Sequence, residues 1–133
     1  MLVLGYDGAM VEVFIERGDQ LSKSRNLMRG SPEYASALAL VSIHSAIAFN
    51  DALLVKLTGR HTMPTDHSGA AKRTKKECSL KNIPPKNIKN LEELLKAKTR
   101  VSYSDEKTTS EIAERLAVSS ERFESWVRPL IRQ

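Results

Sequence analysis

The segment from residue 60 to residue 69, RHTMPTDHSG, places one arginine, two histidines and one aspartate within ten positions. Six residues separate Arg60 from His67, a spacing that some RNA-cleaving proteins use. In such a site the histidine acts as general acid or base and the arginine stabilises the charge that develops on the phosphate. The segment could instead hold a metal ion, or simply connect two helices.

The connection is the interpretation we favour for this segment. Gly59 and Pro64 are typical of a chain that leaves one helix and enters another. Asp66 stands where an N-cap belongs, because its carboxylate can accept from the free N–H groups of the following helix. His67 then falls in the first turn of that helix. A contribution of the segment to a binding site is our second interpretation.

Metal binding and nucleophilic catalysis have weaker signals. His61, Asp66 and His67 are ligand types, but the chain lacks the H-x-x-x-H spacing and the cysteine pair of metal sites. Cys78 lies in a lysine-rich segment that could lower the pKa of its thiol, yet no particular histidine is placed beside it. We therefore predict no metal and no cofactor.

A second pair of polar residues interrupts the most apolar part of the chain. His44 and Asp51 are seven residues apart, so both lie on one face of a helix, with Ala48 between them. Leaving such groups buried without partners would cost a few kcal/mol. They form a hydrogen-bonded pair in the core or a polar contact from helix to helix, or they line a small-molecule or nucleotide pocket.

The positive charge is concentrated in the middle of the chain. The net charge is +5, but residues 56–100 hold twelve Lys/Arg against four Asp/Glu. This surplus favours a polyanion such as nucleic acid, although a solvated face explains it equally well. The basic run has no aromatic residues for base stacking, so it predicts salt-sensitive, sequence-independent phosphate contacts by Lys72, Arg73, Lys75 and Lys76.

The elements that position these residues are all expected to be helices, because β-branched alternation is almost absent. At 133 residues the chain suits a single domain, 1–133. Ser31 with Pro32 predicts a helix start, and Thr108 with Glu111 forms a capping box. The predicted helices run from about Ala9 to Gly30, from Tyr34 to Leu57 with Gly59 closing it, from near Asp66 to Lys81, from about Leu91 to Tyr103, and from the capping box onward.

These helices predict an up-and-down antiparallel bundle of four long helices plus one short one. The turn at residues 105–107 is short enough to pack the last two helices antiparallel. The helix from Tyr34 to Leu57 is apolar on nearly every face, so the other helices should surround it. Its polar residues would be costly in lipid, and with one cysteine and no convincing signal peptide we expect a cytoplasmic protein without membrane contact.

The pattern as a whole resembles the HEPN domain family over about residues 9–128. The likeness lies in YASALALVSIHSAIAFNDALLVKLTG (34–59), in TDHSGA (65–70), which looks like the family's T-H-x-G element, and in the paired helices of 94–126. The resemblance implies a helical bundle that commonly dimerises. Members occur as RNA-cleaving toxins, as partners of minimal nucleotidyltransferases, and as regulatory or nucleotide-binding modules.

This chain departs from the motif of the family's RNA-cleaving members. They carry an arginine followed after four to six residues by a histidine near the start of the last long helix, whereas residues 105–107, after Arg100, are Asp, Glu and Lys. Arg60 and His67 satisfy the count, but Pro64 between them prevents a shared helical face. A dimer could still gather Arg60, His67 and Arg100 around one cleft.

The leading hypothesis is a non-enzymatic HEPN-like module that binds a nucleotide, an RNA or a protein partner, as part of a toxin–antitoxin or nucleotidyltransferase-associated system. We expect a homodimer and no sequence-specific DNA contact. The alternatives are a metal-independent HEPN-type ribonuclease and a purely structural protein-docking subunit. The predicted binding residues are His44, Asp51, His67, Arg100, Tyr103, Lys72, Arg73, Lys75 and Lys76.

Overall fold

The computed structural model describes residues 8–60 and 67–132, and within these ranges every regular element is a helix. The predicted all-α class is therefore confirmed. The elements are α1 (Gly8–Met28), the short 3-10 helix η1 (Pro32–Tyr34), α2 (Ala35–Thr58), α3 (His67–Leu80), α4 (Ile88–Tyr103) and α5 (Ser110–Ile131).

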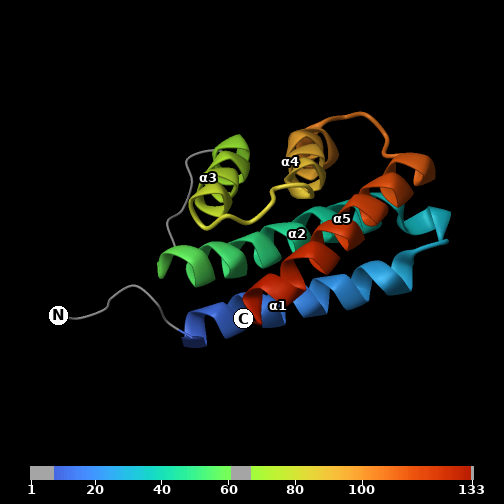
Figure 1. Cartoon of the computed structure of the whole chain (residues 1–133). Helices are drawn as coiled ribbons and strands as arrows, with labels where there is room; N and C mark the ends of the chain where they lie inside the picture. Colours follow the sequence, from blue (N-terminus) through green and yellow to red (C-terminus); the bar gives the residue numbers. More distant parts are fainter. Residues whose placement is uncertain (1–7, 61–66, 133) are drawn as a thin grey trace.

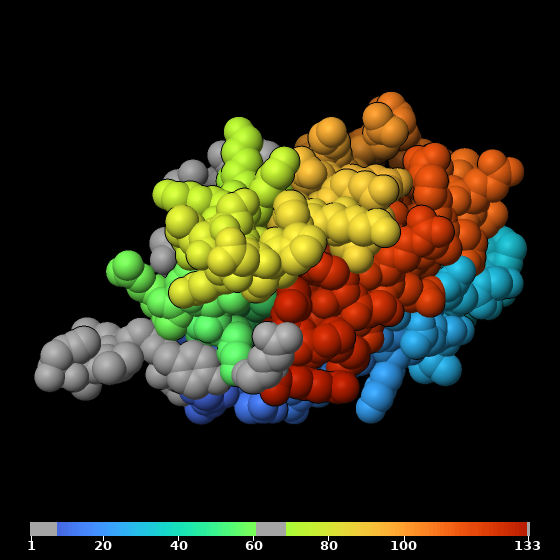
Figure 2. All heavy atoms as spheres, in the orientation of Figure 1, coloured from blue at the N-terminus to red at the C-terminus, as the bar shows by residue number. Residues whose placement is uncertain are grey.

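Three long helices, α1, α2 and α5, lie side by side, and the shorter α3 and α4 run steeply across the direction of α2 (Figure 1). The helix α2 contacts each of the other four α-helices, as expected for the central helix. In the space-filling view, α3 and α4 adjoin and form a continuous part of the surface (Figure 2). We call these two helices with their connection the α3–α4 layer.

The core is organised around α2. Its small residues let neighbouring helices approach closely, and its large ones fill the space between them. By length and composition alone Pro32–Thr58 could cross a membrane, with a mean hydropathy of 1.7, but 72% of its apolar window is buried within this structure. Fully buried side chains of α2 include Leu38, Ala39, Ile43, Ala46, Phe49, Ala52, Leu53 and Val55.

The ends of α2 differ in how well the sequence predicted them. Gly59 closes the helix as expected: it adopts the left-handed conformation, with φ of 81°, and its N–H donates to the carbonyl of Val55 at 2.7 Å. At the other end Ser31 precedes the 3-10 helix η1, makes no side-chain capping bond there, and α2 itself begins only at Ala35. The helix start predicted at Ser31 is therefore present as the turn of η1, but the capping hydrogen bond of the Ser31 hydroxyl is not formed.

The start of α5 is one residue later than the capping box predicted. The N-cap is Thr109, whose hydroxyl accepts from the N–H of Ile112 at 3.2 Å. Thr108 is instead buried, at 8% exposure. A capping box needs a Glu or Gln three residues after the cap, whose side chain accepts from the N–H of the cap residue. The residue three after Thr109 is Ile112, which has no such acceptor, so no capping box forms.

Candidate functional site

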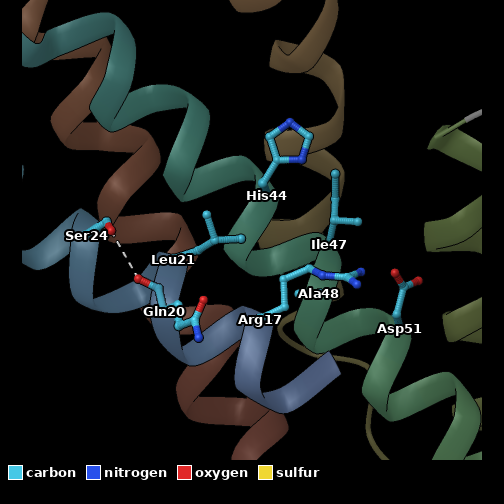
Figure 3. Close-up of a pocket in the computed structure, with 8 residues that line it drawn as sticks. All are labelled: Arg17, Gln20, Leu21, Ser24, His44, Ile47, Ala48 and Asp51. Atoms are coloured by element: carbon cyan, nitrogen blue, oxygen red, sulfur yellow. Dashed lines mark hydrogen bonds between the residues drawn. The ribbon is translucent and has the colours of Figure 1, made fainter. Parts of the chain in front are cut away.

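His44 and Asp51 line one groove between α1 and α2. Both come from α2, one on either side of Ala48, so the face predicted from their spacing is present in the structure. The groove has a volume of about 520 Å³, within the range of ligand-binding clefts. The residues that line it are Arg17, Gln20, Leu21 and Ser24 from α1, and His44, Ile47, Ala48 and Asp51 from α2 (Figure 3).

This groove opens to solvent. His44 is exposed and Asp51 is half-buried, so the two residues do not form a polar pair deep in the core. Its lining combines the apolar residues Leu21, Ile47 and Ala48 with polar and charged ones. A surface groove of mixed polarity can hold a small molecule or the side chains of another protein.

Arg17 is the charged residue of this groove that the sequence did not predict. It extends from α1 toward α2 on the side of Asp51 (Figure 3), and its guanidinium carbon lies 5.4 Å from the centre of the Phe14 ring. Only the packing of α1 on α2 brings it to His44 and Asp51, and spacing within one helix could not predict that.

Arg100 and Tyr103 do not line this groove. Both are exposed in the last turn of α4. The chain leaving α4 leads toward the start of α5, away from the end of α2 that carries Thr58 (Figure 1). Of the predicted binding residues whose side chains are described, only His44 and Asp51 line this groove, and its arginine is Arg17 from α1.

A second groove, of about 440 Å³, lies where the end of α2 meets α3. It holds three cationic side chains, those of Arg60, Arg73 and Lys81, and one carboxylate, that of Glu77. Leu57 and Thr58 complete its lining. We call it the basic groove. Its charges suit an anion with more than one negative charge, such as two successive phosphodiester groups of a nucleic-acid backbone.

The predicted basic run of α3 divides among three directions. Arg73 lines the basic groove, whereas Lys72 lines a crevice on the side of α4. Lys75 and Lys76 are exposed and line neither of these two sites. The run is therefore a positively charged helix surface of which Arg73 and Lys72 line concave sites, and these sites are different.

A buried hydrogen bond ties α3 to α2 and so positions the basic groove. The hydroxyl of Thr74 donates to the side-chain oxygen of Asn50 at 2.5 Å, and both residues are almost fully buried. Neither residue was singled out in the sequence. An asparagine in the apolar α2 segment was the available signal, because a buried amide needs a partner.

The segment that first drew attention lies partly outside the described residues. Pro64, His61 and the predicted cap Asp66 fall within 61–66. The helix α3 begins at His67, as predicted for a helix entry near Asp66, but the described structure does not extend to the side chain of His67.

The described residues offer little for metal or thiol chemistry. Among them no three His, Cys, Asp or Glu side chains gather as a metal site would require. Cys78 is buried, and its burial, with a smaller effect of Glu77, raises the pKa of the thiol. The suggestion that nearby lysines lower this pKa was wrong, because burial disfavours the charged thiolate and Glu77 acts in the same direction.

No protein-family model matches the chain, and none of the curated proteins matches it significantly. Function is therefore inferred from the charges and grooves of the chain itself.

Proposed function

We propose that this chain is a non-enzymatic, HEPN-like module of the cytoplasm that binds RNA through the phosphates of its backbone. The observation that carries the proposal is the charge of the α3–α4 layer. From residue 67 to residue 103 the chain has ten Lys/Arg and three Asp/Glu. One of the three, Glu93, is directed to α5, where it accepts from Ser119 at 2.9 Å.

The basic groove is the best-defined phosphate site of this layer. Arg60 lies just after the left-handed cap Gly59, and its N–H donates to the Thr58 hydroxyl at 3.3 Å, which holds its backbone against the end of α2. Arg73 and Lys81 come from α3 and the residue after it. Each phosphate contact displaces condensed counterions, so three contacts to single-stranded RNA give a salt slope of about −2.

The experiment is a titration of a labelled single-stranded RNA by fluorescence anisotropy at several salt concentrations. The variant Arg60→Gln/Arg73→Gln/Lys81→Gln should bind at least tenfold more weakly and with a smaller salt slope. A control with the same loss of charge, Lys23→Gln/Arg122→Gln/Arg132→Gln, changes exposed residues of α1, α5 and the residue after α5. Equal weakening by both triple variants would reject the basic groove as the binding site.

The ribonuclease hypothesis is tested in the same samples. Arg60 belongs to the basic groove, and His67 begins α3, so an RNA held there would lie near the residues of that hypothesis. Incubation with a mixed RNA pool and a chelator should leave the RNA intact. Cleavage by the wild type that is lost in His67→Ala would show that the protein is an enzyme after all.

A second candidate function, docking of a protein, is favoured by the outer face of α1. Val13, Arg17, Gln20, Ser24 and Leu27 follow at spacings of three and four residues, the spacing of a helix-packing face. Val13 is 52% exposed and Leu27 is 84% exposed, and the α1–α2 groove lies alongside them. We propose a homodimer formed through this face, since Arg17 of one copy could meet Asp51 of the other.

The dimer is tested by light scattering after size-exclusion chromatography. Leu27→Glu should yield a monomer, whereas Leu80→Glu, at an exposed leucine of α3, should leave the dimer intact. A wild-type monomer would exclude this interface. If that monomer instead binds a nucleotidyltransferase or antitoxin encoded by a neighbouring gene, and Leu27→Glu abolishes this binding, the face belongs to such a partner.

A further inference from the structure

A third concave site lies within the α3–α4 layer itself. It is a crevice of about 240 Å³ between the two helices. Ala71 and Leu95 form its apolar floor, at 4% and 7% exposure, and three charged residues that are exposed stand around them. The charged residues are Lys72 of α3 and Glu92 and Lys96 of α4.

We propose that this crevice takes one unstacked nucleobase of a single-stranded RNA while Lys72 and Lys96 contact the phosphates on either side of it. The proposal rests on the RNA-binding function proposed above and specifies which form of RNA binds. It adds a contact to the bases, which phosphate binding alone does not include.

The size of the crevice limits what can enter. Whole small-molecule sites usually measure about 300–1,000 Å³, so 240 Å³ accommodates only part of a ligand. At about 30 Å³ for a water molecule in the liquid, it has the room of about eight waters. A pyrimidine base with its substituents has a comparable number of heavy atoms, whereas a complete nucleotide is too large.

The combination of surfaces selects a nucleic acid over an apolar ligand. An apolar floor between two lysines suits a ligand that carries an apolar ring next to negative charges, as a nucleotide unit does. Bases of an RNA duplex are stacked and paired, so only a single strand can present one to the crevice. With Ala71 and Leu95 in place of an aromatic residue, burial of the ring supplies the contact.

Glu92 gives the crevice a preference among bases. A carboxylate accepts from an exocyclic amino group, such as N4 of cytosine or N6 of adenine. Uracil has a carbonyl oxygen at the position of the cytosine amino group, and this oxygen would face the carboxylate unfavourably. Cytosine and adenine should therefore bind better than uracil.

The test compares a cytidine oligomer, a uridine oligomer and an oligomer of abasic sites, all of one length, by fluorescence anisotropy. We expect the cytidine oligomer to bind at least fivefold more tightly than either of the others. Glu92→Gln should bring cytidine and uridine within twofold of each other. Glu111→Gln, a change of the same kind at an exposed position of α5, should leave the preference unchanged.

A second variant fills the crevice. Ala71→Leu should abolish the advantage of the cytidine oligomer over the abasic one, while thermal unfolding followed by circular dichroism shows whether the helices remain. Because Glu92 is exposed, Glu92→Gln tests the preference even if the filled variant does not fold.

Two negative outcomes are distinguishable. If all three oligomers bind the wild type equally and salt weakens them alike, the crevice takes no base and the proposed phosphate binding stands. If none binds, the proposed function fails, and the base site with it.

Discussion

Arg25 of α1 is paired with Glu124 of α5 in a nearly solvent-free contact. Its Nη2 lies 3.0 Å from Oε1 of Glu124, and the two side chains are 3% and 13% exposed. Nη1 of Arg25 donates to the hydroxyl of Ser120 at 2.9 Å. Burial lowers the pKa of Arg25, while Glu124 acts in the opposite sense and favours the charged guanidinium. The pair joins the first helix to the last.

Removing Arg25 should be strongly destabilising. In Arg25→Ala the carboxylate of Glu124 loses its most buried partner but keeps Arg128, whose Nε donates to Oε2 at 2.8 Å. Breaking a buried pair costs about 3–5 kcal/mol when the remaining charge has no partner, so we expect a loss at or below the lower end of that range. Urea unfolding followed by circular dichroism measures the loss. Arg122→Ala, at an exposed arginine of α5, should stay within about 0.5 kcal/mol of the wild type. A loss below about 1 kcal/mol for Arg25→Ala would mean that Arg128 or water takes over the role of Arg25 at Glu124.

Gly18 should not tolerate even a methyl group. A Cβ at this position would lie 2.9 Å from two carbons of the Phe49 ring. That ring is fully buried, and the guanidinium carbon of Arg128 lies 4.8 Å from its centre, so it has little freedom to move. Alanine gains about 1 kcal/mol over glycine in helix propensity, but overpacking costs about 1–3 kcal/mol.

We therefore expect Gly18→Ala to lower the free energy of unfolding, and Gly18→Val to lower it further. Gln20→Ala, at an exposed position of the same helix, provides the control and should be nearly neutral. A stabilised Gly18→Ala would contradict close packing of α1 on α2.

The hydrogen bond between Thr74 and Asn50 should show strong non-additivity. Thr74→Val leaves the buried side-chain oxygen of Asn50 without this donor, at a cost of about 1–3 kcal/mol. Replacing both partners, in Thr74→Val/Asn50→Leu, removes both polar groups and should recover part of that loss. The double-mutant cycle is measured by urea unfolding, and simple additivity of the two single changes would show that the bond contributes nothing.

Glu114 should make the fold sensitive to acid. Its Oε2 accepts from the N–H of Gly30 at 2.8 Å, and Oε1 accepts from Nε of Arg29 at 3.0 Å. The backbone bond from Gly30, followed by the Arg29 contact, lowers the pKa of Glu114 despite the opposing effect of partial burial. A carboxyl group with a lowered pKa stabilises the fold above its ordinary value of 4.5, and this contribution is lost as the pH falls below it.

The measurement compares wild type with Glu114→Gln, at neutral pH and again well below 4.5. The wild type should be more stable at neutral pH, and the difference should shrink in acid. The exposed residue Glu111, changed to Gln, should show a smaller change of this kind. A difference that is constant with pH would rule out titration of Glu114 as its cause.

The sequence by itself determined the helical class, the central position of α2 and the shared face of His44 and Asp51. These depend on the period of one helix and on local chemistry, such as the left-handed conformation that Gly59 adopts readily. A local pattern can also be wrong by one residue. The capping box predicted Thr108 as the cap of α5, whereas Thr108 is buried and the neighbouring Thr109 is the cap.

Only the tertiary structure decided which residues of different helices meet. The period of α1 places Arg17 on a face but does not say what that face opposes, since the rotation and depth of packing depend on contacts such as Gly18 against Phe49. The same holds for Arg25 with Glu124. Side chains far apart in the chain meet because close packing admits few arrangements of whole helices, and no local pattern records which one is chosen.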